Sequence, residues 1–323
     1  MNILNDIITD TQILSQRYIV RNGFVFVSGF GKANIFDTLL IRNPSNAPCS
    51  CPRLPFSTRT LNEHIQLINQ YKLKSAYLIA EDIKFIKQCP SLSEISVTPS
   101  DTSGNQFDFS PLYSLPKITH LYCATEYGNR FQFKSSIDYS QINGLLDLNI
   151  SGQGHFNSHT IPTLQRLAIS KAIVKSRDLN DIFTSSYLQN LTVIQSNIQT
   201  LNGIEKSNCL SSLSLWHNRS LCDISLIISN SKTLKTLSIE ACPKISDFSF
   251  LEELESLEEL ELFGSNALPD LNFVNKLTKL KKFCFSMKVS NGDLTPCLKI
   301  PYAYCQKAYK HYNLKDKDLP KQK

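Results

Sequence analysis

The apolar residues of this sequence recur with a fixed spacing, apolar-x-x-apolar-x-apolar, over most of its length. In the most regular stretch, successive copies begin 22 to 24 residues apart. These copies are Leu164/Leu167/Ile169, Leu188/Leu191/Val193, Leu210/Leu213/Leu215, Leu234/Leu237/Ile239, Leu257/Leu260/Leu262 and Leu280/Phe283/Phe285. Because side chains alternate between the two sides of a strand, each copy predicts a short strand whose apolar side chains share one face.

The same spacing continues upstream with looser steps. Its upstream copies are Leu92/Ile95/Val97, Ile118/Leu121/Cys123 and Leu145/Leu148/Ile150, with weaker ones beginning at Phe36 and Leu73. A second pattern follows the strands, because Asp223, Asp247 and Asp270 occupy matching positions in three similar segments, 24 and 23 residues apart. Two independent patterns therefore share one period, which indicates an array of repeats.

These two patterns resemble the leucine-rich repeat family, in its short form of about 22–24 residues that is common in intracellular and bacterial proteins. The resemblance implies an α/β fold, a curved solenoid with a concave parallel β-sheet and a convex side of short helices, 3-10 turns and loops. It also implies a ladder of small or polar side chains three residues after each strand's last apolar residue. That position holds Ser196, Asn218, Cys242 and Ser265.

The repeats suggest three regions. The first, 1–34, is an N-terminal cap with a strand at Phe24–Val27. The second, 35–290, is a solenoid of about 9–11 repeats with insertions near 43–55 and 99–111. The third, 291–323, is a C-terminal cap with a Lys-rich tail. Within the last region we expect a short helix from Tyr302 to Tyr312, followed by a solvated polar tail.

The residues between the apolar strand positions should face outward on the concave sheet. Among them are four aromatic residues that the solenoid core does not require, Tyr77, Tyr122, Trp216 and Phe263. Such rings either anchor a partner protein or pack on neighbouring long side chains.

Acidic residues share this face. Glu240, Glu259 and Glu261 come from adjacent repeats and should cluster beside Trp216 and Phe263, with His217 directly after an outward position. The cluster is either a solvated charged surface or, through the mutual repulsion of its carboxylates, a site for a cationic partner surface.

No motif for catalysis, a metal or a cofactor is found. The sequence has no phosphate-binding loop, no Gly-x-Ser-x-Gly, no His-Glu-x-x-His and no Cys-x-x-Cys. The close pair Cys49 and Cys51 has no second pair at zinc-like spacing, and His155 and His159 lie in a glycine-containing turn rather than on a helix. We therefore predict no enzyme activity, no metal and no cofactor.

The charge is unevenly distributed. The chain of 323 residues has a formal net charge of +6, from 34 Lys and Arg against 28 Asp and Glu. Residues 299–323 hold seven lysines and two acids, so this segment supplies five of the six net positive charges. The repeats are nearly neutral and carry an acidic patch on the face predicted to bind.

The N-terminal residues carry no basic segment before an apolar run, and no apolar stretch approaches the roughly 20 residues of a membrane span. We therefore expect a cytoplasmic protein with reduced cysteines and no membrane partner.

The predicted function is non-catalytic binding of another protein, with a basic surface, on the concave face. Stand-alone repeat proteins of this kind look like bacterial cognate inhibitors, so the most specific hypothesis is an immunity protein that neutralises a toxin such as a nuclease, whose substrate-binding surface must be basic. Two alternatives stay open: an adaptor or regulatory subunit of a larger assembly, and an RNA-binding protein that uses the basic C-terminal tail.

Overall fold

The computed structural model describes most of the chain. The described residues are 18–21, 24–27, 38–42, 61–80, 82–99, 107–123, 137–151, 161–180 and 187–322. The chain divides into two compact units, Met1–Gly154 and His155–Lys323. The predicted insertion at 43–55, residues 100–106 of the second insertion, most of the predicted N-terminal cap, and the residues Cys49, Cys51, His155 and His159 lie outside the described part.

The first unit contains an antiparallel strand pair and a parallel sheet. The pair is β1 (Tyr18–Arg21) with β2 (Phe24–Val27), which confirms the strand predicted at Phe24–Val27. The sheet has the order β3-β4-β5-β6-β7, with all neighbours parallel. Its elements in chain order are β3 (Thr38–Arg42), α3 (Leu61–Tyr71), β4 (Ser75–Ala80), η2 (Lys84–Gln88), β5 (Glu94–Pro99), η4 (Ser110–Ser114), β6 (His120–Cys123), η5 (Tyr139–Gln141) and β7 (Asp147–Ser151).

The second unit continues the same plan with greater regularity. Its parallel strands are β8 (Arg166–Ser170), β9 (Asn190–Ile194), β10 (Ser212–Trp216), β11 (Thr236–Glu240), β12 (Glu259–Phe263), β14 (Lys282–Phe285) and β16 (Tyr302–Cys305), in that order across the sheet. A two-residue parallel pair, β13 (Ala267–Leu268) and β15 (Lys288–Val289), lies apart from this sheet. The 3-10 turns are η6 (Ile204–Lys206), η7 (Ser225–Asn230), η8 (Ser249–Glu253), η9 (Asn272–Asn275), η10 (Thr295–Lys299) and η11 (Asp316–Asp318).

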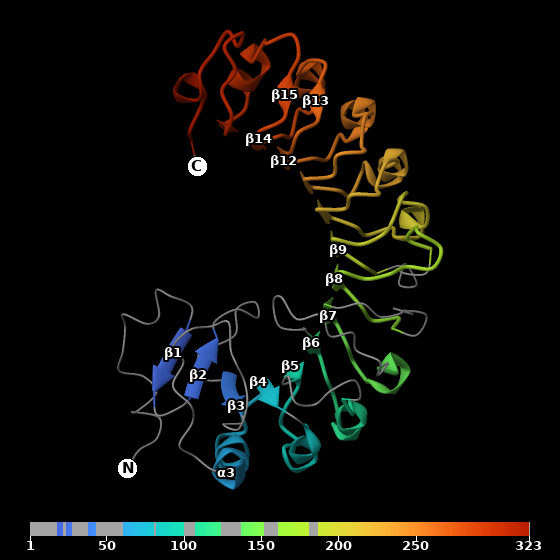
Figure 1. Cartoon of the computed structure of the whole chain (residues 1–323), viewed down its shortest axis with the longest axis vertical. Helices are drawn as coiled ribbons and strands as arrows, with labels where there is room; N and C mark the ends of the chain where they lie inside the picture. Colours follow the sequence, from blue (N-terminus) through green and yellow to red (C-terminus); the bar gives the residue numbers. More distant parts are fainter. Residues whose placement is uncertain are drawn as a thin grey trace. The chain divides into compact units, whose positions relative to one another are not determined.

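Within this unit the strands line a concave inner side, and the turns from η7 to η10 follow its outer side (Figure 1). This arrangement confirms the predicted curved solenoid with a parallel sheet and a convex side of 3-10 turns. We call the outward side of β8, β9, β10, β11, β12, β14 and β16 the concave face.

The core forms because equivalent apolar residues stack strand on strand. Leu213 pairs in register with Leu237, and Leu237 with Leu260. All three are fully buried, whereas the alternating residues of these strands point away from the core. One repeat could not bury its own leucines, so each layer depends on its neighbours. Burying one such side chain contributes about 2–3 kcal/mol.

Each strand from β8 to β11 is followed directly by a residue in the left-handed conformation. The φ angles are +54° at Lys171, +50° at Gln195, +57° at His217 and +50° at Ala241. In each case the backbone N–H donates to the carbonyl at the end of the next strand, as from His217 to Glu240 at 2.7 Å. The repeated turn therefore determines where each of these four strands ends, and it positions the backbone of His217.

The ladder predicted after each strand is only partly present. Asn218 is fully buried, accepts a hydrogen bond from the backbone of Ser196 at 2.9 Å and donates to the carbonyl of Val193 at 2.8 Å. Cys242 is buried too, and its thiol donates to the Leu215 carbonyl. The prediction is wrong for Ser265, because the side chain of this residue is exposed and does not take part in the ladder.

The neighbouring residue replaces Ser265 in this role. The amide nitrogen of Asn266 donates to the carbonyls of Cys242 and Ile245, at 3.2 and 2.6 Å. The longer amide side chain reaches the previous turn from one position further along, which leaves Ser265 in solvent.

The periodic aspartates open the 3-10 turns. The carboxylates of Asp223, Asp247 and Asp270 each accept a hydrogen bond from the backbone N–H two residues later, at 3.0, 2.8 and 2.7 Å. The same contact recurs at Asp82, Asp108, Asp138, Asp178 and Asp293, so the motif extends beyond the three copies predicted. These turns bring the chain back along the convex side toward the next strand.

The C-terminal segment differs from the prediction. The helix expected from Tyr302 to Tyr312 is wrong, because Tyr302–Cys305 forms β16 beside β14. Nor is the tail simply solvated, because Leu319 is 3% exposed and the backbone N–H of Ala303 donates to the carbonyl of Pro320. The tail therefore covers the outer edge of the last strand, as edge strands require.

Candidate functional site

Three predicted site residues stand side by side at the ends of adjacent strands. Trp216 of β10 is in register with Glu240 of β11, which is in register with Phe263 of β12. All three are half-buried and face outward, since the strand residue before each of them is buried. We call Trp216, Glu240 and Phe263 the aromatic row.

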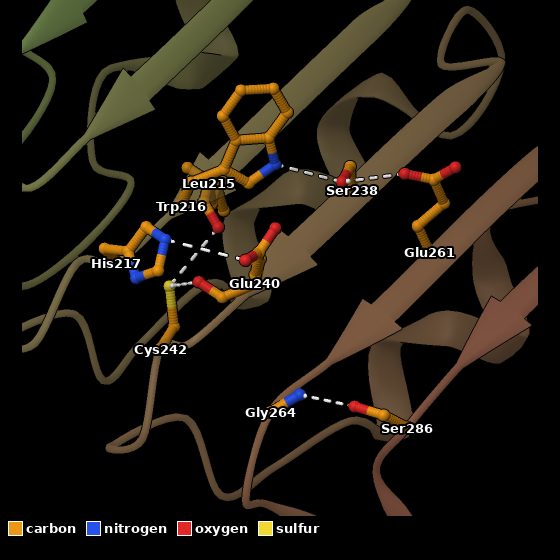
Figure 2. Close-up of polar contacts among 9 residues, drawn as sticks. All are labelled: Leu215, Trp216, His217, Ser238, Glu240, Cys242, Glu261, Gly264 and Ser286. Carbon is orange, nitrogen blue, oxygen red and sulfur yellow. Dashed lines mark hydrogen bonds and ion pairs between the residues drawn. The ribbon is translucent and has the colours of Figure 1, made fainter. Parts of the chain in front are cut away.

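A chain of hydrogen bonds holds Trp216 in place. Its indole N–H donates to the hydroxyl of Ser238 at 3.0 Å, and Ser238 donates to the carboxylate of Glu261 at 3.2 Å (Figure 2). Lys282 completes the chain by donating to the other oxygen of Glu261 at 2.7 Å. Four neighbouring strands thus contribute one residue each, and the indole has a defined position before any partner arrives.

The small size of Ser238 makes this chain possible. Ser238 is an outward residue, yet it is only 5% exposed. Figure 2 shows the indole of Trp216 reaching across toward β11, with its nitrogen directed at this hydroxyl. A longer side chain at position 238 would occupy the space that the indole now reaches into.

Two further contacts modify the expected acidic cluster. Glu259 lies 3.7 Å from Lys282, and Glu240 lies 3.5 Å from Nε2 of His217. The hydrogen bond that Lys282 donates to Glu261 raises the pKa of Lys282, so this lysine stays charged. The predicted mutual repulsion is therefore partly offset, because the ammonium group of Lys282 contacts two of the three carboxylates.

The remaining predicted residues lie in the first unit. Tyr77 is in β4, where its backbone is in register with Leu40 and Ser96; its side chain is outside the described part. Tyr122 is a half-buried residue of β6, in register with Ser96 and Asn149. The predicted site residues therefore divide between the two units. Tyr77 and Tyr122 belong to the first unit. The second unit contains Trp216, His217, Glu240, Glu259, Glu261 and Phe263.

Two tyrosines on the concave face were missed in the sequence. Tyr302 and Tyr304 are the outward residues of β16, and Tyr304 is in register with Cys284 of β14. The amino group of Lys321 lies 5.7 and 5.3 Å from the centres of these two rings. The sequence does contain a signal for this strand, because Ile300, Ala303 and Cys305 repeat the apolar spacing. All three residues are buried in the structure.

The thiols near this surface are not poised for chemistry. Burial raises the pKa of Cys242 and of Cys284, so both stay protonated at neutral pH. The eight cysteines of the described residues are free. Within the same described part, no group of three or more His, Cys, Asp or Glu residues could hold a metal ion, and no helix is long and apolar enough to cross a membrane.

The comparisons with known proteins point to one fold. No protein-family model matches this sequence, and no curated protein matches it. An internalin (InlF) of Listeria monocytogenes is structurally similar, with a TM-score of 0.52 and 16% identity over 83% of this chain and 80% of the internalin. This chain has the leucine-rich repeat fold.

Two receptor structures show weaker similarity. The plant peptide hormone receptor RGFR1, in complex with RGF2, matches with a TM-score of 0.37 and 14% identity over 72% of this chain and 51% of the receptor. TLR13, in its complex with ssRNA13, matches with a TM-score of 0.41 and 16% identity over 76% of this chain and 45% of TLR13. This chain thus spans about half the length of either receptor chain.

Proposed function

We propose that this chain binds a partner protein through the concave face of its second unit. The single observation that carries the proposal is the fixed position of Trp216, the only tryptophan in the sequence, on an outward surface. Tryptophan is enriched among the residues that dominate binding energy at protein interfaces. A side chain already held by Ser238 loses little conformational entropy on binding.

The charge around Trp216 suggests the chemistry of the partner. Glu240, Glu259 and Glu261 outnumber the one lysine that faces them, Lys282, so the surface keeps an excess of negative charge. A basic partner surface would complement it and would associate faster at low salt.

The narrower function that we propose is that of a cognate inhibitor, such as an immunity protein that neutralises a toxin. A nuclease toxin carries a basic substrate-binding surface, and an acidic, aromatic face is suited to covering it. An adaptor or regulatory subunit would use the same face. RNA binding by the tail is less well supported, because the amino group of Lys321 is bound to Asp316 and to the carbonyl of Ala303.

The proposal is tested by comparing the proteins retained from the native host by the wild-type chain, by Trp216→Ala and by Leu226→Ala. Leu226 is a suitable control because it is an exposed apolar residue on η7, on the convex side. We expect one partner to be retained by the wild type and the control and lost with Trp216→Ala. A partner retained equally by all three would contradict binding at this face.

The charge argument and the inhibitor function need separate measurements on the purified partner. Glu259→Lys combined with Glu261→Lys should weaken binding steeply, and added salt should slow association with the wild type. If the partner is a toxin, co-expression of the wild-type chain should protect cells and co-expression of Trp216→Ala should not. A partner without toxic activity would instead favour the adaptor function.

A further inference from the structure

The centre of the aromatic row is a carboxylate between two rings. Glu240 is in register with Trp216 on one side and Phe263 on the other. Neighbouring strands are about 4.8 Å apart, so the two aromatic residues start about 10 Å from each other with Glu240 midway. The side chain of Glu240 is 45% exposed, and its acidic group is open to a ligand from the concave side.

The indole of Trp216 offers this ligand a ring face rather than a hydrogen bond. Its N–H is already donated to Ser238, so it has no donor left for a partner. The face of an indole ring attracts cations. A cation that touches both the ring and the carboxylate of Glu240 would therefore be favoured over a neutral or an anionic group.

Guanidinium fits this pair of groups better than ammonium. It is planar, so it can stack on an aromatic face, and its fork of N–H donors matches the two oxygens of a carboxylate. Resting on the function proposed above, we propose that Trp216 and Glu240 bind one arginine side chain of the partner protein. Phe263 is the neighbour of Glu240 on the opposite side of the row.

The neighbouring charges permit this binding. Lys282, in β14, contacts Glu259 and Glu261 of β12. Its ammonium group is therefore engaged by carboxylates other than Glu240. The imidazole of His217 faces Glu240 at 3.5 Å and is 48% exposed. The turn holds His217 by its backbone N–H, so its side chain can move aside without disturbing the strand.

The single tryptophan makes the site directly observable. The indole N–H signal of Trp216 in a proton–nitrogen correlation spectrum is the only one of its kind from this chain. We would titrate the full chain with Nα-acetylarginine amide, and in parallel with the citrulline and lysine analogues. Citrulline has nearly the same shape as arginine but no charge.

We expect a saturable shift of the indole signal with the arginine probe, a smaller one with lysine and none with citrulline. Glu240→Gln should abolish the arginine shift, and Glu253→Gln, an exposed carboxylate on η8, should leave it unchanged. An equal response to citrulline or to lysine, or a shift that persists in Glu240→Gln, would overturn the assignment. Unchanged thermal unfolding of Glu240→Gln would show that the variant is folded.

The site and the proposed function can fail separately. If the purified partner binds in a manner that needs Trp216 but not Glu240, the face is a protein-binding surface and the arginine site is wrong. If the arginine probe binds as expected but no protein is lost with Trp216→Ala, the site stands and the proposed function is wrong.

Discussion

The indole N–H of Trp216 donates to the hydroxyl of Ser238 on the next strand, 3.0 Å away, and this hydroxyl is almost completely covered. A large, half-buried ring is thereby held against the sheet by a small residue. Because Ser238 also donates to Glu261, the position of the ring is linked to the ionic contacts of Lys282.

Ser238→Ala removes this link without removing the ring. We expect the affinity for the partner to fall several-fold, because the indole must then be ordered on binding, and the free energy of unfolding to fall by about 1 kcal/mol. Titration calorimetry and urea unfolding would measure the two effects. Ser214→Ala, on the neighbouring strand in register with Ser238, is the matched control; an unchanged affinity in Ser238→Ala would contradict preorganisation.

Asn218 and Ser265 share one ladder position in sequence but should differ sharply in their importance. Asn218→Ala leaves the backbone N–H of Ser196 and the carbonyl of Val193 buried without their partner, so we expect a loss of about 2–4 kcal/mol. Ser265→Ala changes an exposed side chain and should cost less than about 0.5 kcal/mol. Equal losses in urea unfolding would show that the ladder does not depend on burial.

Ala241 should be improved by glycine. Its φ of +50° is in the left-handed region, which costs a residue with a side chain about 1–2 kcal/mol. Glycine removes that cost and loses about 0.5–1 kcal/mol through its greater freedom in the unfolded chain. We therefore expect Ala241→Gly to stabilise the fold by up to about 1 kcal/mol, whereas Ala267→Gly in β13 should destabilise it. A higher melting temperature for the first variant only would confirm this.

The aspartates of the 3-10 turns should make the fold sensitive to acid. Backbone hydrogen bonds from Ser225 and Ser249 lower the pKa of Asp223 and Asp247 below the ordinary value of 3.8. Their stabilisation is therefore present above that value and is lost as the pH falls through the lowered pKa values.

The double variant Asp223→Asn with Asp247→Asn keeps the acceptor oxygens and removes the titration. Its free energy of unfolding should fall less steeply with decreasing pH below about pH 4 than that of the wild type. Urea unfolding at a series of pH values would measure this, with Glu253→Gln as a control on the same convex side. Parallel curves for the variant and the wild type would count against the proposed origin of the sensitivity.

Removing the tail should expose a sheet edge. Residues 314–323 include Leu319, which is buried, and Asp316, which accepts from the backbone N–H of Cys305 at 2.8 Å. Without them the unpaired edge of β16 is free to join another chain. We expect concentration-dependent oligomers in light scattering, which the exposed-residue control Lys317→Ala should not form. A monomeric truncated chain would show that the tail is dispensable for covering this edge.

The sequence predicted the strands correctly where leucine occupies the buried positions. Leu213 and Leu215 mark a strand because only its buried side is apolar, and the register of Trp216 with Glu240 follows from the period. β16 was missed because Ala303 and Cys305 are weaker signals than leucine, and because Ile300 follows Leu280 by 20 residues rather than about 23.

The contacts within the site were harder to foresee. The register places Lys282 beside Glu259, but its reach to Glu261 depends on a side-chain conformation that the repeat spacing does not determine. In the same way, nothing in the spacing distinguishes Ser265 from Asn266 as the residue that reaches the previous turn.

The in-register parallel strands also turn the concave face into a grid. Across the strands its positions are about 4.8 Å apart, and along a strand outward residues recur about every 6.6 Å. Insertion of one complete repeat between β11 and β12 would move Phe263 away from Glu240 by a single grid step while leaving every side chain on its own side of the sheet. A partner of this surface must therefore match distances that change only in whole steps, and duplication or loss of a repeat would switch its specificity abruptly rather than gradually.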